Sequence, residues 1–316
     1  MNDLANNPLK LLFQNLSDVI IGSKESLLLT LATLLSNGHL LIEDAPGLGK
    51  TTLAKALARS MSVDFRRLQC TPDLTPSDIT GISIFNLEEH QFHFHPGPVF
   101  TNILLVDEIN RATPRTQSAL LEAMSEGTVT IDRKTHKLDD CFMVVATQNP
   151  VEFSGTYPLP EAQLDRFLMR ISLGYPNEDD EVHIISAQQK EHPLEGIKAV
   201  LDAERLGKLQ AMAEEITINQ DMLRYIAKLV RATREHKAVR LGASPRGSLA
   251  LMRAGKSLAL LTGKKTVTPH IIHKLAQPVL GHRLIFRDSS LYELGAQEVF
   301  FKELLQSIAV PDNPEQ

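Results

Sequence analysis

The chain has 316 residues, of which 43% are hydrophobic and 22% charged, which excludes a disordered chain, a collagen-like chain and a small disulfide-stapled domain. Lys and Arg number 33 against 38 Asp and Glu, so the net charge of −5 gives no overall field that attracts nucleic acid or an anionic membrane. Cys70 and Cys141 are too few for a disulfide framework or a zinc site, and we expect buried, reduced thiols. No signal peptide is recognisable and the most apolar stretch, 27–35, is too short to cross a bilayer, so we expect a cytoplasmic protein without membrane insertion.

The first part of the chain alternates short apolar runs with helical patterns. This alternation is typical of an α/β fold with a mostly parallel sheet and helices on both faces. A capping residue followed by proline marks a helix start at Thr113-Pro114. Two stretches, 82–94 and 128–138, predict β-hairpins inserted into this core. The expected strands are 40–42, 65–70, 103–106, 142–146 and 167–173.

The second part of the chain has a helical period throughout. Asn177 precedes four acidic residues, a pattern typical of a helix cap with a favourable first turn. Ser244-Pro245 and Thr268-Pro269 repeat the cap-then-proline start. We therefore expect two domains: an α/β core over 1–176 and an all-α lid over 177–316, which ends in a short frayed tail.

A phosphate-binding loop follows the first expected strand. Residues 44–51 read Asp-Ala-Pro-Gly-Leu-Gly-Lys-Thr and open a helical pattern. Small residues let backbone N–H groups point at a triphosphate, Lys50 can reach the β- and γ-phosphates, and the Thr51 hydroxyl can ligate Mg²⁺. The strict motif has glycine where this chain has Asp44, at the end of the loop farthest from the γ-phosphate. The expected nucleotide-binding residues are Pro46, Gly47, Leu48, Gly49, Lys50, Thr51 and Thr52.

A second polar cluster is expected at neighbouring strand ends. Behind a phosphate loop, Asp107 would hold magnesium through water and Glu108 would polarise the attacking water as general base. Asn149 follows another apolar strand, and its amide can orient that water against the γ-phosphate. Arg166 and Arg246 are further candidates, although an isolated arginine more often belongs to a surface ion pair.

Together these residues resemble an AAA+ ATPase, and more closely the MoxR family. The similar stretches are 71–78, 96–100, 107–112, 116–124, 146–150 and 242–246. The resemblance extends from about Val19 to Arg283. It implies a P-loop NTPase core with a helical lid, ATP and Mg²⁺ as ligands, and a homo-oligomeric, usually hexameric ring.

The resemblance also assigns roles to individual residues. It implies that Asn149 acts as sensor 1, Arg166 as arginine finger and Arg246 as sensor 2. It further implies that Ile20 and Ile21 pack against the adenine ring, although an apolar turn before a helix would look similar.

The function that the resemblance implies is ATP hydrolysis used to remodel or activate a protein partner, often one with a von Willebrand factor A domain. An ATP-driven nucleic-acid motor and a metal-chelatase-type ATPase subunit are the alternatives. The 82–94 hairpin looks like an insert shared with chelatase subunits and replicative helicases, but it carries two glutamates where a phosphate-gripping hairpin would carry Lys or Arg. The stretch 229–265 holds nine Lys or Arg against Glu235 alone. Because it lacks interleaved aromatic residues, contact with the nucleotide and the next subunit is favoured over nucleic acid.

Overall fold

The computed structural model describes residues 2–149, 155–187, 189, 193–292 and 295–311. A fully parallel five-stranded sheet lies at its centre, in the order β2-β5-β8-β1-β9. All five strands predicted from the sequence are confirmed. They are β1 (Leu40–Glu43), β2 (Phe65–Gln69), β5 (Ile103–Asp107), β8 (Met143–Gln148) and β9 (Met169–Ile171).

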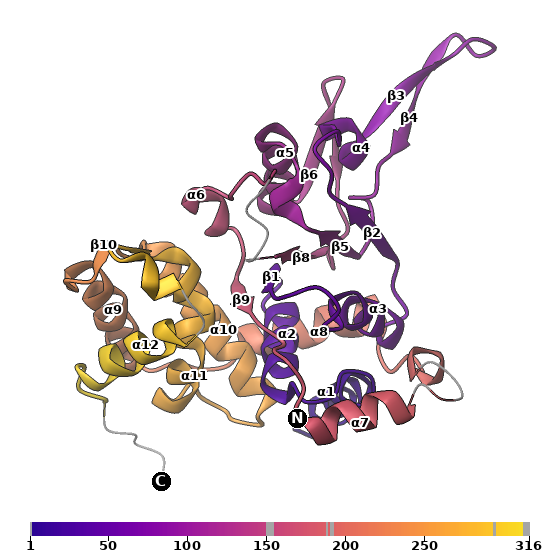
Figure 1. The fold of residues 1–316 in the computed structure, drawn as a ribbon. Helices are drawn as coiled ribbons and strands as arrows, with labels where there is room; N and C mark the ends of the chain where they lie inside the picture. Colours follow the sequence, from indigo (N-terminus) through magenta and orange to yellow (C-terminus); the bar gives the residue numbers. More distant parts are fainter. Residues whose placement is uncertain (1, 150–154, 188, 190–192, 293–294, 312–316) are drawn as a thin grey trace.

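The sheet is covered on both faces, which explains why its central strands are continuous apolar runs. Successive side chains of β5 enter opposite layers: Ile103 packs into one apolar cluster and Leu104 into the other. The first layer contains α1 (Asn2–Ser17), α2 (Lys24–Leu35) and α3 (Lys50–Ser60). The second contains α4 (Pro76–Thr80) and α5 (Pro114–Glu126), on the other side of the sheet (Figure 1).

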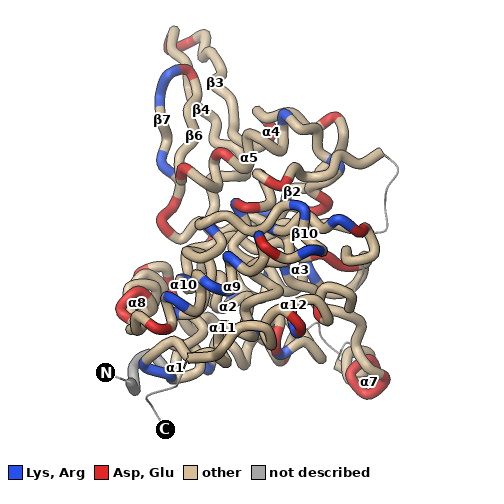
Figure 2. Tube along the Cα trace, turned by 90° about the vertical axis from the view of Figure 1, so that its left-hand side faces the viewer, with Lys and Arg blue, Asp and Glu red and all other residues tan. Residues whose placement is uncertain are grey.

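Both predicted hairpins are confirmed as antiparallel pairs. They are β3 (Gly81–Asn86) with β4 (Gln91–Pro96), and β6 (Thr128–Ile131) with β7 (Lys134–Lys137). The β3–β4 hairpin projects far from the body of the molecule (Figure 1). Its strands and turn contain no Lys or Arg, and acidic residues mark its tip (Figure 2). The Phe94 ring stacks on His136 with ring centroids 4.2 Å apart, which links the two hairpins near their bases.

Where the structure describes it, the C-terminal part is mostly helical, with one short antiparallel pair, β10 (Val239–Leu241) with β11 (Ile285–Phe286), and an isolated β-bridge between Thr217 and Thr266. The expectation of purely α structure missed this pair, because only the packing of the buried Val239 and Phe286 brings the two short segments together. The helices of this part are α7 (Glu178–Ala187), α8 (Ala203–Glu214), α9 (Gln220–Glu235), α10 (Pro245–Leu261), α11 (Pro269–Leu280) and α12 (Ala296–Gln306).

The predicted caps of this part lie where the sequence places them. The Asn177 side chain accepts from the N–H of Asp180 at 2.8 Å, and the Ser244 hydroxyl accepts from the N–H of Arg246 at 3.2 Å. Helix α10 packs against α2, α8 and α11. The Lys and Arg residues of the basic stretch 229–265 are distributed over α9, β10, α10 and the loops around them (Figure 2). A domain division at residue 176 stays a prediction, and the expected frayed tail lies outside the described residues beyond position 311.

Both cysteines are free and buried, as predicted. Burial raises the pKa of the Cys70 thiol to about 12, helped by the negative charges of Asp107 and Glu108. Among the described helices, none combines the length and apolar character that crossing a bilayer requires.

Candidate functional site

The predicted phosphate loop lies between the end of β1 and the start of α3. Gly47 and Gly49 have φ values of +88° and +86°, which a residue with a side chain adopts only under strain. Gly49 caps α3 without any side-chain hydrogen bond, and the first turn of α3 contains no acidic residue. The N–H groups and positive end of this helix are therefore available to an anion, which is the arrangement a phosphate group requires.

Lys50 lies at the start of α3, within reach of three negative groups. Its Nζ donates to the main-chain oxygen of Asp44 at 2.7 Å. Burial lowers the pKa of Lys50, and the charges of Asp44, Asp107 and Glu108 oppose that shift. The structure thus brings the predicted phosphate-binding lysine near the predicted magnesium-binding and base carboxylates.

Asp107 ends β5 at the carboxyl edge of the sheet, where open α/β sheets bind their ligands. Its side chain is 10% exposed. One carboxylate oxygen accepts from Arg67 Nε at 2.7 Å and the other from the Thr147 hydroxyl at 3.2 Å. With the Thr51 hydroxyl at the start of α3, this carboxylate offers the oxygen ligands that Mg²⁺ prefers, so the residues fit the predicted metal.

Glu108 has a left-handed backbone, with φ of +55°, which is uncommon for a residue with a side chain. Its N–H donates to the Thr147 hydroxyl at 2.9 Å. Its Oε2 accepts from Gln69 Nε2 at 2.9 Å and from Arg111 Nη1 at 3.0 Å. Both donors bind the same oxygen, so the predicted general base is oriented through Oε2, while Oε1 accepts none of the described hydrogen bonds and can take a proton from water.

Four of these contact residues were missed by the sequence reasoning. Arg67 and Gln69 belong to β2, and only the pairing of β2 with β5 brings them beside the two acids. Thr147 lies on β8, two positions before the predicted Asn149. Arg111 ends the 3₁₀ turn that directly follows the two acids. Their only sequence signal is a polar side chain near a strand end, which is common in proteins.

Asn149 directly follows β8, which pairs with both β1 and β5. Because the carboxyl ends of paired parallel strands lie at one edge of the sheet, the half-buried Asn149 lies at the edge that carries the phosphate loop and Asp107. Ile20 is buried, with its Cδ1 3.4 Å from where a Cβ on Gly49 would lie, and Ile21 is half-buried. The predicted adenine-packing segment therefore lies beside the phosphate loop.

The two candidate arginines contact other parts of the chain. Arg166 Nη1 donates to the main-chain oxygen of Leu121 at 2.9 Å and to the Ser125 hydroxyl, both on α5. The Nη1 atom of Arg246 lies 3.7 Å from Oδ2 of Asp165, and the arginine side chain is largely exposed. The same Asp165 accepts from Arg283 Nε at 2.7 Å. Among the contacts of the described residues, neither arginine pairs with Asp107 or Glu108 of its own site.

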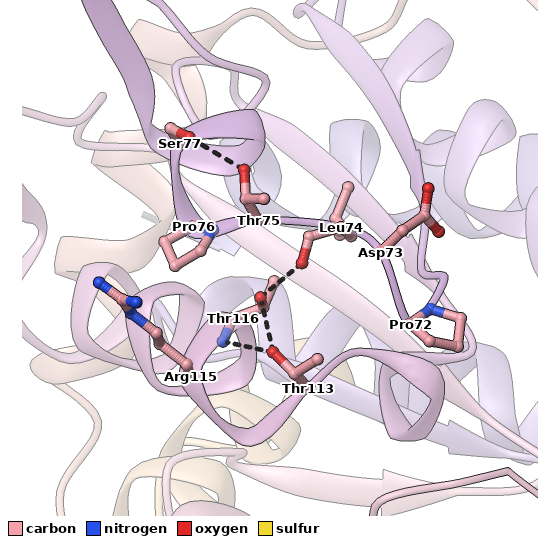
Figure 3. A pocket seen from close by; sticks show the side chains of 9 residues that line it. All are labelled: Pro72, Asp73, Leu74, Thr75, Pro76, Ser77, Thr113, Arg115 and Thr116. Atoms are coloured by element: carbon pink, nitrogen blue, oxygen red, sulfur yellow. Dashed lines mark hydrogen bonds between the residues drawn. The ribbon is translucent and has the colours of Figure 1, made fainter.

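A cavity of about 450 Å³ lies apart from these groups, between the segment 72–77 and the first turn of α5 (Figure 3). Its polar groups largely satisfy one another: the Thr116 hydroxyl donates to the Leu74 oxygen at 2.7 Å and also contacts Thr113. None of the site residues predicted from the sequence lines this cavity.

Known proteins resemble this chain along nearly all of its length. Residues 39–169 match the family described as ATPase family associated with various cellular activities (AAA), and residues 231–299 match the AAA lid domain. The protein YeaC of Bacillus subtilis is 46% identical over 298 residues, which cover 94% of this chain and 93% of that protein. Chaperone MoxR1 of Mycobacterium tuberculosis is 39% identical over 302 residues, which cover 93% of this chain and 80% of that protein. A crystal structure of a proposed ATPase from Cytophaga hutchinsonii superposes with a TM-score of 0.90 at 35% identity and covers 98% of this chain and 97% of its own.

Proposed function

Since the chain belongs to the MoxR family of AAA+ ATPases, we propose that it hydrolyses ATP with Mg²⁺ and uses the turnover to remodel or activate a protein partner. One observation carries the proposal: Lys50 follows two glycines with left-handed backbone, at the start of a helix whose N–H groups no capping side chain occupies, and it lies near Asp107 and Glu108. This arrangement suits a nucleoside triphosphate and its metal, because phosphoryl transfer needs positioning and charge stabilisation more than covalent chemistry.

Each residue then has a defined task. The loop 46–52 would bind the phosphates through its N–H groups and Lys50, and Thr51 and Asp107 would hold Mg²⁺. Bound Mg²⁺ would neutralise charge on the β- and γ-phosphates. Glu108 would take the proton of the attacking water at Oε1, the carboxylate oxygen that none of its described hydrogen bonds occupies. Asn149 would orient the same water.

We further propose a homo-oligomeric ring of six subunits in which Arg166 serves the neighbouring site. Arg166 donates to α5 and to no residue of its own phosphate loop among its described hydrogen bonds, which is compatible with a role across an interface. Arg246, at the first turn of α10, would reach the nucleotide from the lid after leaving Asp165. In this proposal the α/β core spans 1–176 and the lid 177–316.

The partner is proposed to be a protein, of the kind that carries a von Willebrand factor A domain, because the family resemblance implies it and one relative is named a chaperone. The projecting β3–β4 hairpin agrees with this choice. It exposes apolar side chains, including Leu87 at 77% and Phe92 at 70%, and carries no Lys or Arg that would grip a nucleic-acid backbone.

Two substitutions test the site. Lys50→Ala should lose ATP binding, because the side-chain cation of the phosphate loop is gone, whereas Lys55→Ala, an exposed lysine on the same helix, should bind normally. Glu108→Gln should keep ATP binding and lose turnover, because an amide cannot accept the proton of water. Turnover of Glu108→Gln at the parental rate would show that another group is the base.

The same Glu108→Gln chain can identify the partner. Held with ATP and recovered from a lysate, it should retain proteins that the Lys50→Ala chain does not. Stimulation of the parental ATPase by a recovered protein supports the remodelling role, whereas stimulation by single-stranded DNA alone supports a nucleic-acid motor.

A further inference from the structure

Asp44 occupies the position where the strict phosphate-loop motif has glycine, and its side chain has partners that glycine could not have. It is 6% exposed. Its Oδ2 accepts from the N–H of Leu173 at 2.6 Å. Its Oδ1 accepts from the Ser172 hydroxyl at 2.5 Å and from the N–H of Gly174 at 3.4 Å. Asp44 is absent from the described residues with positive φ, so the backbone does not require glycine here.

The segment 172–174 that Asp44 binds joins β9 to α7. Its carbonyl groups are held as well, since the Ser26 hydroxyl donates to the Ser172 oxygen at 2.6 Å and the Ser23 hydroxyl to the Leu173 oxygen at 2.5 Å. The segment therefore has its N–H groups fixed by the phosphate loop and its oxygens fixed at the start of α2. Movement of either support changes where the chain enters α7.

Asp44 also contacts the phosphate-binding lysine, because its main-chain oxygen accepts from Lys50 Nζ. One residue thus touches Lys50 through its backbone and the segment 172–174 through its carboxylate. Phosphate oxygens would compete with the Asp44 carbonyl for the N–H donors of Lys50. Nucleotide binding would then alter the bonds that position Asp44.

A second connection starts at the neighbouring residue. Glu43 accepts from Arg170 Nη1 at 2.9 Å, and Nη2 of the same arginine donates to Gln297 on α12 at 2.7 Å. The end of β1 is therefore bonded to the C-terminal helices as well as to the segment before α7. This makes the start of the phosphate loop a structural junction between the two parts of the chain.

We propose that Asp44 is a positioning residue that transmits nucleotide binding at the phosphate loop to the segment 172–174, and through it to α7 and the C-terminal helices. The inference rests on the proposed ATPase function. The coupling requires a carboxylate, because its two oxygens together accept from a hydroxyl and two N–H groups, whereas an amide has one accepting oxygen. An Asp44→Gly chain has the strict loop motif yet lacks the connection.

Hydrogen exchange of the full-length protein, with and without the ATP analogue AMP-PNP and Mg²⁺, tests the proposal. In the parental chain, AMP-PNP should slow exchange in peptides from both the phosphate loop and 172–187. Asp44→Gly should keep the response of the loop and lose the response of 172–187. Asp44→Asn, which preserves size, should show the same loss, and Ser172→Ala a smaller one because two main-chain bonds remain. Asp64→Asn, an exposed acid, is the matched control.

Steady-state kinetics gives a second readout. Asp44→Gly should lower kcat about tenfold while KM for ATP changes by less than about threefold, as expected when binding is intact and a later step is lost. A parental response of 172–187 in Asp44→Gly and Asp44→Asn, or loss of AMP-PNP binding by both, would overturn the proposal. A parental chain whose phosphate loop responds while 172–187 does not would overturn it too, and would leave the ATPase function standing. A parental chain that binds no AMP-PNP would instead contradict the proposed function.

Discussion

Lowering the pH should destabilise the protein through His39, a residue outside the nucleotide site. His39 is 8% exposed and joins two elements: its Nδ1 accepts from the N–H of Val144 on β8 at 3.0 Å, and its Nε2 lies 3.0 Å from the Met124 oxygen on α5. With Nδ1 accepting, Nε2 carries the proton and donates, so the ring is neutral. Burial lowers the pKa of His39 from 6.5 to about 4, against the smaller opposite effect of the bond to Met124.

The sign and size of the effect follow from these two pKa values. Because the folded pKa is the lower one, the unfolded chain binds the proton first as the pH falls. The contribution to stability is present above pH 6.5 and is lost between about pH 6.5 and about pH 4. At about 1.4 kcal/mol per pKa unit the full loss is about 3 kcal/mol, of which about 2 kcal/mol falls between about pH 7 and pH 5.

Urea unfolding of the parental chain and of His39→Gln, each at pH 7 and pH 5, measures this loss. Glutamine can donate and accept in place of the ring, but it does not titrate. The parental free energy of unfolding should fall by about 2 kcal/mol more than that of the variant over this range. The buried His282, whose pKa is also lowered, is present in both chains, so its effect cancels in the comparison. An equal pH dependence of the two chains would refute the assignment.

Two further predictions concern catalysis. Arg166→Ala should bind ATP and assemble almost normally yet hydrolyse it about 10³-fold or more slowly, and mixing it with Lys50→Ala subunits should restore some turnover, because one interface can then pair an intact Lys50 with an intact Arg166. Mixed rings with verified subunit exchange that stay as inactive as either parent would contradict the role across an interface. Gln69→Ala should raise turnover by up to about tenfold in a steady-state ATPase assay, because a hydrogen bond that stabilises the ionised form of Glu108 is removed and the carboxylate accepts the proton of water more readily; about 1.4 kcal/mol corresponds to about one factor of ten. A fall in turnover would show instead that Gln69 orients the base.

Local sequence patterns were sufficient to predict the elements whose signals lie within a few residues. The run Ile103 to Val106 predicted a strand because a parallel strand buried on both faces is apolar throughout, and β5 is buried along its length. Thr113-Pro114 predicted the start of α5 because the cap and the proline act within one turn. The phosphate loop was recognisable because its glycines and lysine have to be contiguous to surround a phosphate.

The contacts between side chains from segments distant in sequence depended instead on how the whole chain packs. Glu108 and Gln69 are 39 positions apart, and they touch because β2 lies beside β5 in the sheet order. Asp44 looked like a departure from a motif until β9 paired with β1 and brought Ser172 and Leu173 against its carboxylate. Strand order is set by how whole layers pack, and no local pattern encodes it. For the same reason the sequence identified the groups that bind phosphate, but not the contacts that hold them in place.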